Sequence, residues 1–125
     1  MAYKYYMNNP SGKIVGDCVV RAVSLATDEN WQKTYIALAL QGFIMSDILN
    51  SDAVWGAYLR NSGFVRHAIP NTCPDCYTVE DFAKDHPEGV YVLGTGSHAV
   101  AVIQGDWMDA WNSANEIPIF YYSRD

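Results

Sequence analysis

The spacing of hydrophobic residues predicts four helices, three of them in the first half of the chain. Between Asp17 and Ala26 apolar residues recur at i, i+3, i+4 and i+7, the pattern of a helix that buries one face, and Asp17 is placed to act as its N-cap. Comparable spacing after Glu29 and after Ser51 predicts two more helices, and the Thr-Val-Glu-Asp sequence from Thr78 is typical of a helix start. The predicted helices span about 17–26, 31–42, 51–61 and 79–84.

In the last third of the chain short apolar runs alternate with glycine-containing turns, which indicates strands. We predict strands over about 90–93, 98–104, 107–111 and 117–122, with a hairpin turn at Gly105-Asp106 and a lead-in strand of aromatic residues near the N-terminus. There is no internal repeat and no linker. Helices that precede an antiparallel sheet predict a single α+β domain over residues 1–125.

The charge balance narrows the classes of partner. The net charge at pH 7 is −6, and the 8 Lys and Arg residues are scattered along the chain, whereas nucleic-acid binding needs a basic patch. The acidity disfavours anionic lipid surfaces, and no apolar run reaches the roughly 18–20 residues of a membrane span. The N-terminal stretch lacks the apolar centre of a signal peptide. We therefore expect a cytoplasmic protein with no nucleic-acid or membrane partner and no cofactor.

Three cysteines without an export signal argue against a disulfide framework and predict reduced thiols. Cys73 and Cys76 have the two-residue spacing of a zinc or redox motif. A structural zinc needs four ligands, and His67 and His86 do not complete an evident set, so we predict no metal site. A bare loop is the simplest interpretation, and a reversible disulfide is the alternative.

Cys18 stands alone at the start of the first predicted helix, in the sequence Gly-Asp-Cys. The N-terminus of a helix carries partial positive charge and unpaired N–H groups, which stabilise a thiolate and a developing oxyanion. The alternative is that Cys18 is an ordinary small core residue, because free cysteine is among the most buried residue types. Arg21, one turn later, is predicted to form a salt bridge with Asp17 or Asp109.

His98 opens a predicted apolar strand and is the candidate general base for Cys18. An imidazole in this role needs an Asp or Asn to fix its orientation. With the turn at Gly105-Asp106, Asn112 is the nearest amide but has the wrong parity, and Asp109 shares the face of His98 but lies roughly 13 Å along the ladder. We favour Asn112 over Asp109. Trp107 and Trp111 either line the cleft or pack within the sheet.

These segments resemble the papain-like cysteine peptidases. The sequence G-D-C-V-V-R-A resembles the nucleophile helix of that superfamily, and H-A-V-A-V-I followed by a hairpin and W-N-S resembles its His and Asn strands. The chain is more closely similar to small papain-like proteins of gut Firmicutes and their phages, which carry G-D-C-x-x-R-A, a strand led by His, and D-x-W-[DN]. Asp109, Trp111 and Asn112 match the last motif. The resemblance implies a papain-like fold.

The resemblance also implies a thiol peptidase or isopeptidase in which Cys18, His98 and Asn112 or Asp109 form a triad and a thioester acyl-enzyme forms on Cys18. Papain-like peptidases usually place an oxyanion-donating Gln about six residues before the nucleophile, where this chain has Gly12. We predict that the side chain of Asn9 or Asn8, with Asn9 preferred because it precedes Pro10, and the backbone N–H of Cys18 supply the donors. Two alternatives stay open. One is an amidase or acyl transferase on the same fold, and the other is a catalytically weak domain that binds a protein partner. The oligomeric state stays open.

Overall fold

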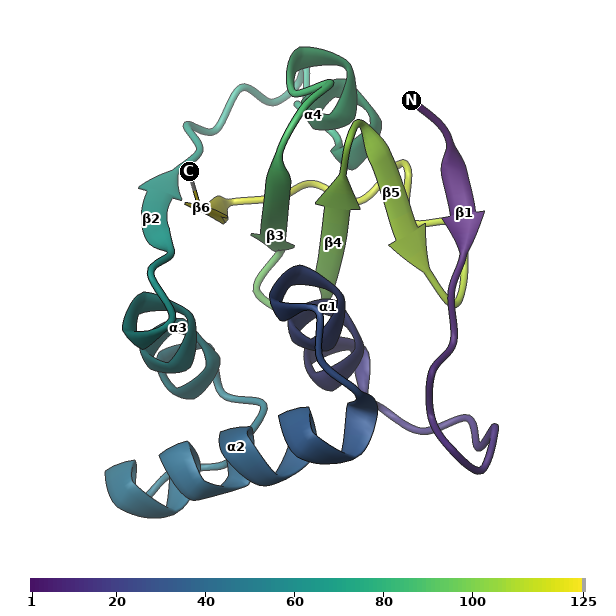
Figure 1. Ribbon diagram of the computed structural model, residues 1–125. Helices are drawn as coiled ribbons and strands as arrows, with labels where there is room; N and C mark the ends of the chain where they lie inside the picture. The colour runs from purple at the N-terminus through teal and green to yellow at the C-terminus, as the bar shows by residue number, and fades with distance from the viewer. Residues whose placement is uncertain (125) are drawn as a thin grey trace.

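The computed structural model describes residues 1–124, which form four helices and a six-stranded sheet of the α+β class (Figure 1). The helices are α1 (Cys18–Thr27), α2 (Trp31–Met45), α3 (Asp52–Asn61) and α4 (Val79–Asp85). The strands are β1 (Tyr3–Tyr5), β2 (Val65–Ala68), β3 (Val90–Gly94), β4 (Ala99–Ile103), β5 (Asp106–Asp109) and β6 (Phe120–Arg124).

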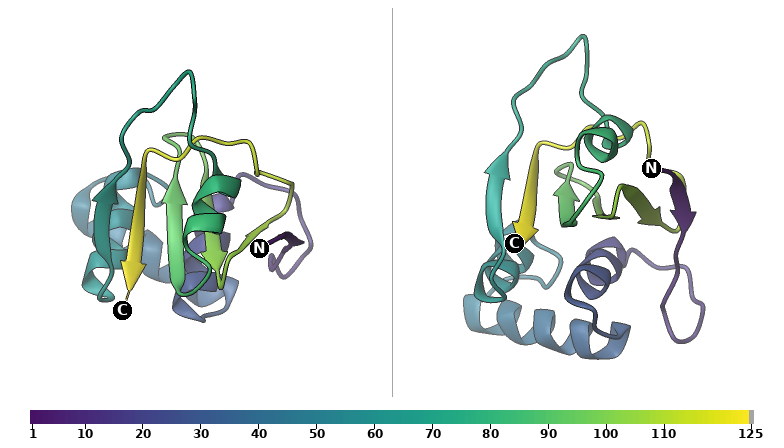
Figure 2. Two further views of the ribbon diagram at one scale, coloured as in Figure 1. Left: turned by 90° about the horizontal axis from the view of Figure 1, so that it is seen from above. Right: turned by 45° about the horizontal axis from the view of Figure 1, so that its top comes forward.

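The strands lie in the order β1-β5-β4-β3-β6-β2. All neighbours are antiparallel except β1, which pairs in parallel with β5 at one edge. Helices α1, α2 and α3 lie on one face of the sheet and α4 lies on the other (Figures 1 and 2). The predicted arrangement of helices against an antiparallel sheet is thus present, with the N-terminal strand added to the edge.

The side chains of β4 alternate between two hydrophobic cores, one on each face of the sheet. Ala99 and Ala101 face α1, and their small side chains let the helix lie close to the sheet. Val100 and Val102 point to the opposite face, where α4 covers them with Phe82. Because both faces are buried, the strand is apolar throughout, which is why its sequence predicts a strand without an alternating pattern.

Helix α2 continues beyond its predicted end at Gly42 to Met45. Gly42 lies on the buried face, and a Cβ there would lie 2.7 Å from the backbone oxygen of Asp47. A glycine is needed at this position because the chain that follows the helix folds back against it. The left-handed residue that ends α2 is instead Ser46.

Four further features differ from the predictions: the bounds of β5 and β6, the β4–β5 turn and strand β2. Strand β5 covers Asp106–Asp109 and β6 covers Phe120–Arg124, where the predicted strands were 107–111 and 117–122. The β4–β5 turn is Gln104-Gly105, one residue earlier than predicted, and both residues have the positive φ angles of a tight hairpin turn. Strand β2 was not predicted, because it is a short edge strand with mostly exposed side chains and therefore lacks a hydrophobic pattern.

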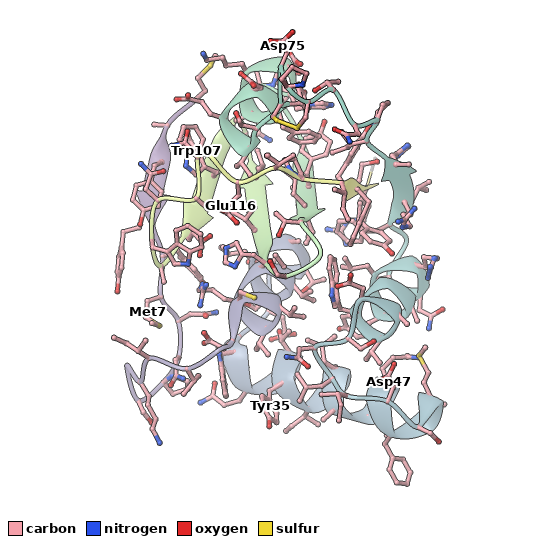
Figure 3. All side chains as sticks on the ribbon, turned by 180° about the vertical axis from the view of Figure 1, so that it is seen from behind. Met7, Tyr35, Asp47, Asp75, Trp107 and Glu116 are labelled. Carbon is pink, nitrogen blue, oxygen red and sulfur yellow. A yellow bond between two sulfur atoms is a disulfide. The ribbon has the colours of Figure 1, made fainter. Side chains whose placement is uncertain are left out.

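The prediction of reduced thiols is wrong for Cys73 and Cys76, whose sulfur atoms are bonded at 2.04 Å. The intervening Pro-Asp turn brings the two Cα atoms to 4.2 Å, so the sulfurs meet without help from the rest of the fold. Figure 3 shows this disulfide near Asp75, at the opposite end of the molecule from α2. Cys18 is the one free cysteine in the described chain.

Candidate functional site

Cys18 is the first residue of α1 and lies half-buried against the start of β4. Its sulfur interacts with the backbone N–H of Ala99 and with the ring of His98. Both residues of the predicted nucleophile–base pair line one cavity of about 240 Å³, which Asn50 and Trp55 also line. The structure therefore brings together two residues that are 80 positions apart in the sequence, at the positive end of a helix.

A tight turn between β3 and β4 holds His98 in place. Gly96 takes a left-handed φ of 96°, the N–H of His98 donates to Thr95 Oγ1 at 3.0 Å, and the N–H of Thr95 donates to the carbonyl of His98 at 2.9 Å. The ring of Trp111 lies 4.7 Å from the imidazole, centroid to centroid. The side chain of His98 is consequently only 10% exposed.

Asp109, the last residue of β5, orients the imidazole. Its Oδ2 lies 2.6 Å from His98 Nε2, which leaves Nδ1 of the ring for the sulfur of Cys18. The hydroxyl of Ser113 donates to the same carboxylate oxygen at 2.8 Å. The Asp109 side chain is 1% exposed, so its charge acts with little screening by water.

Arg21 holds the other oxygen of the Asp109 carboxylate, so the salt bridge predicted for Arg21 is present. Its guanidinium donates to Asp109 Oδ1 at 2.8 Å and to Asp17 Oδ1 at 2.6 Å, and all three side chains are buried. Asp17 also accepts a hydrogen bond of 2.9 Å from the indole N–H of Trp31. Asp17 precedes α1 as predicted, but its side chain makes no capping hydrogen bond because it is engaged by Arg21 and Trp31.

The electrostatics favour a thiolate beside an imidazolium. Burial opposes charge on His98, but its hydrogen bonds to Asp109 and Cys18 outweigh that effect and raise its pKa to about 9. Burial likewise opposes ionisation of Cys18, yet the hydrogen bonds from His98 and from the Ala99 N–H lower its pKa. For Asp109, burial is outweighed by the hydrogen bond to His98 and by the surrounding donors, so its pKa is lowered.

The structure places Asp109, and not Asn112, against His98, which corrects our preference. Because the hairpin turns one residue earlier than predicted, extending its register puts His98 opposite Trp111 and makes Asp109 a diagonal neighbour two residues away. This distance is about half of the predicted one, and the parity is right. Asn112 instead accepts hydrogen bonds from the indole N–H of Trp107 at 3.0 Å and from the N–H of Ala114 at 3.1 Å.

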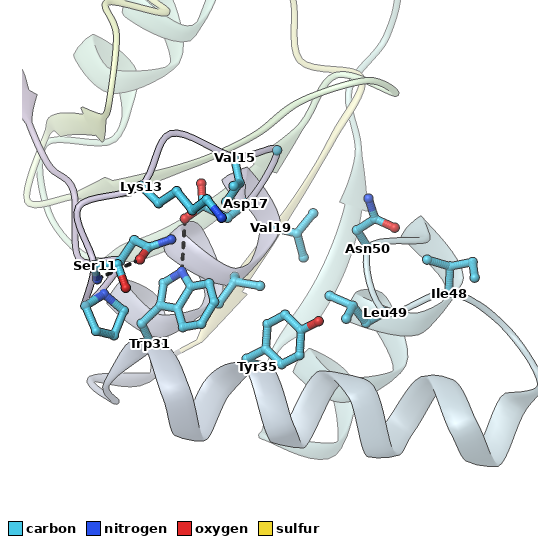
Figure 4. Close-up of a pocket in the computed structure, with 14 residues that line it drawn as sticks. Ser11, Lys13, Val15, Asp17, Val19, Trp31, Tyr35, Ile48, Leu49 and Asn50 are labelled. Carbon is cyan, nitrogen blue, oxygen red and sulfur yellow. Dashed lines mark hydrogen bonds between the residues drawn. The ribbon is translucent and has the colours of Figure 1, made fainter.

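A larger cleft of about 560 Å³ adjoins the cavity of Cys18 and shares Val19 and Asn50 with it (Figure 4). The rings of Trp31 and Tyr35, stacked at 5.2 Å, form part of its floor along α2. Its remaining lining residues come from the loop before α1, from α1 itself and from the turn after α2: Asn9, Pro10, Ser11, Lys13, Val15, Gly16, Asp17, Val20, Ile48 and Leu49.

The predicted oxyanion donor Asn9 lies in this larger cleft and does not line the cavity of Cys18 and His98. Its side-chain oxygen accepts a hydrogen bond from the N–H of Ser11 at 2.9 Å and so closes a local turn. Asn50 is the side-chain amide that lines both cavities, and sequence reasoning missed it. It sits in the loop before α3 with no motif around it, so no sequence signal identifies it.

Comparison with protein-family models, with curated proteins and with solved structures finds no match to this chain. Within residues 1–124, no group of three or more His, Cys, Asp and Glu residues is arranged to hold a metal ion. No helix in the same range is long and apolar enough to cross a membrane.

Proposed function

We propose that this protein is a papain-like cysteine hydrolase that cleaves a peptide or isopeptide bond through Cys18, His98 and Asp109. The observation that carries the proposal is the geometry of the site, in which Cys18 and His98 line one cavity and Asp109 holds the imidazole. A thiol with a lowered pKa lies against an imidazole with a raised pKa, and a buried carboxylate holds that imidazole at 2.6 Å. A structural core cysteine has no need of such partners.

In the proposed reaction, the thiolate of Cys18 attacks the substrate carbonyl carbon and forms a C–S bond. His98 then donates the proton on Nδ1 to the leaving amine as the C–N bond breaks, which leaves a thioester on Cys18. The neutral imidazole next takes a proton from water, whose oxygen attacks the thioester. Release of the acid regenerates the thiolate and the imidazolium.

The carboxylate of Asp109 stabilises the imidazolium in the resting state and keeps Nδ1 directed at the sulfur. Arg21 and Ser113 occupy the other lone pairs of this carboxylate and fix its plane. Arg21 acts through Asp109 and is a positioning residue.

The oxyanion of the tetrahedral intermediate needs two donors. In our proposal the first is the backbone N–H of Cys18 at the N-terminus of α1, and the second is the side-chain amide of Asn50. Asn50 lines the cavity of Cys18, and its amide makes no hydrogen bond with any residue in the described range 1–124. It replaces the upstream glutamine that papain-like peptidases use, whose position holds Gly12.

The cleft beside the site supports a peptide substrate with an apolar side chain. It is lined mainly by apolar and aromatic groups and shares Val19 with the cavity of Cys18. Its volume of about 560 Å³ falls within the range of ordinary ligand pockets. An apolar side chain adjacent to the scissile bond can occupy it against Trp31 and Tyr35.

The test is covalent labelling with a peptide acyloxymethyl ketone that carries an aromatic residue, followed by intact-mass analysis. Wild type should gain one probe per chain at neutral pH, and Cys18→Ala should gain none while it unfolds at the same urea concentration. The matched control is the double variant Cys73→Ser with Cys76→Ser, which should label like wild type. Absence of labelling in wild type, or labelling of Cys18→Ala, would refute the assignment.

A second measurement separates hydrolysis from the alternative reactions on the same residues. Peptide libraries incubated with the protein and analysed by mass spectrometry distinguish cleavage of the main chain from loss of ammonia at a glutamine side chain. A binding domain without activity should produce neither product, and its Cys18 should alkylate with the pH dependence of an ordinary thiol.

A further inference from the structure

Helix α2 has two opposite apolar faces. Its inner face buries Leu38 and Gly42 against the rest of the molecule. Its outer face carries Ile36, Leu40 and Phe43, which share one side of the helix by their spacing of three and four residues. Charged residues are missing from position 34 to position 46. A helix in contact with water on one side normally carries polar residues there.

The outer face is large and well exposed. Phe43 is 82% exposed, Ile36 and Ile44 are each 67% exposed, and Leu40 is 58% exposed. These four side chains present on the order of 500 Å² of apolar surface, within the range of the largest patches on monomeric proteins. A standard interface buries about 800 Å² on each partner. About 65% of a homodimer interface is apolar, so the exposed apolar area of this face is close to the apolar area that a stable dimer buries.

We infer that two copies of this chain associate through the outer faces of α2, with the helices antiparallel about a two-fold axis at Leu40. The sequence around Leu40 is self-complementary in this arrangement. Ile36 and Ile44 lie four residues on either side, so each packs on the other in the partner subunit. Lys33 lies seven residues before Leu40, two turns away on the same side of the helix, so it lies beside the C-terminal end of the partner subunit's α2.

The electrostatics favour a second copy over other occupants. Lys33 lies at the N-terminal end of α2 and has a loose ion pair with Glu29 at 4.0 Å. Antiparallel pairing places this cation beside the C-terminal end of the partner subunit's α2, where the helix dipole attracts positive charge. An anionic lipid surface would instead require several cations around the apolar face, and Lys33 is the one cation in α2.

The association leaves the catalytic cleft open. Trp31 and Tyr35 line that cleft from a different side of α2, so the partner subunit does not cover it (Figure 4). The dimer is independent of the proposed hydrolase activity, and it can be tested in a variant that lacks Cys18.

The test uses cysteine cross-linking in a Cys18→Ala background, where the remaining cysteines are joined in a disulfide. Leu40→Cys, at the two-fold axis, should form a covalent dimer within minutes of mild oxidation. Ile36→Cys alone should not, but an equimolar mixture of Ile36→Cys and Ile44→Cys proteins should. Ile14→Cys is the matched control, because Ile14 is 91% exposed and lies outside α2. It should stay monomeric.

Sedimentation velocity supplies the second measurement. Wild type should sediment as a dimer at micromolar concentrations, and Leu40→Arg, which places two like charges at the axis, should sediment as a monomer with the far-UV circular dichroism spectrum of wild type. The inference is overturned by a monomeric wild type, by a dimeric Leu40→Arg variant, or by equal cross-linking at residues 14 and 40. Binding of monomeric wild type to zwitterionic vesicles would assign the face to lipid and would also overturn it.

Discussion

Replacing Asp109 by asparagine tests the electrostatic basis of the site directly. Asp109 is 1% exposed, contacts His98 Nε2 at 2.6 Å and is the carboxylate that holds the proton on that ring. Asparagine has the same size and keeps an oxygen acceptor, but it removes the negative charge. The substitution therefore separates orientation of the imidazole from stabilisation of its charge.

The magnitude follows from the pKa of His98. This pKa is about 9, compared with 6.5 for an ordinary histidine, and the difference of about 2.5 pKa units corresponds to about 3 kcal/mol in favour of the imidazolium. A nearby opposite charge typically accounts for one to three pKa units. Burial lowers the pKa of His98, and the charge of Asp109 opposes this effect. We therefore expect Asp109→Asn, which removes that charge, to lower the pKa of His98 by about two units. The pKa of Cys18 should rise as its cationic partner is lost.

Two assays measure these changes. NMR titration of the His98 ring reports its pKa, and the rate of iodoacetamide alkylation as a function of pH reports the thiolate fraction of Cys18. At pH 6 the alkylation rate of Asp109→Asn should be lower than that of wild type, because the thiolate fraction of Cys18 falls as its pKa rises.

The control is Ser113→Ala, which removes a hydrogen bond to the same carboxylate oxygen but leaves its charge. Its two titration curves should lie close to those of wild type. The reasoning is refuted if wild-type His98 titrates near 6.5, or if Asp109→Asn leaves both curves in place while urea unfolding shows that the variant is folded.

Three further predictions concern stability. Arg21→Met should lower the free energy of unfolding by about 3–5 kcal/mol in urea titrations, because it leaves the buried carboxylate of Asp17 without a cation and that of Asp109 with His98 alone, and a loss below 1 kcal/mol would contradict this role. Gly94→Ala should cost about 1–3 kcal/mol in thermal unfolding, because its Cβ meets an aromatic ring on β6, whereas Gly16→Ala has open space and should be neutral. In Cys18→Ala, the stabilisation from protonated His98 should be complete below pH 6.5 and lost as pH rises toward its folded pKa. Wild type should lose less stability than Cys18→Ala over the same pH range, because the lowered pKa of Cys18 makes its thiol release a proton on folding, which offsets the proton taken up by His98.

Local pattern was enough for most of the secondary structure and for half of the site. Apolar spacing placed α1, α3 and α4 within a residue or two, because each buries a continuous face that repeats along the chain. The same reasoning placed Cys18 at a helix start and His98 at a strand start, since both positions depend on elements close to them in sequence. Strand β2 escaped because an exposed edge strand is held by backbone pairing, which leaves no hydrophobic pattern.

Only the tertiary structure could decide which carboxylate or amide meets His98. The choice depended on the hairpin register, and a shift of one residue in the turn moved Asp109 into reach and left Asn112 with Trp107. Tertiary contacts also decided the bridging position of Arg21, which sequence reasoning had paired with one acid or the other. Residue types and their spacing determine which elements form. Long-range packing determines which side chains meet, because such contacts join segments whose separation in sequence carries no information about their distance in space.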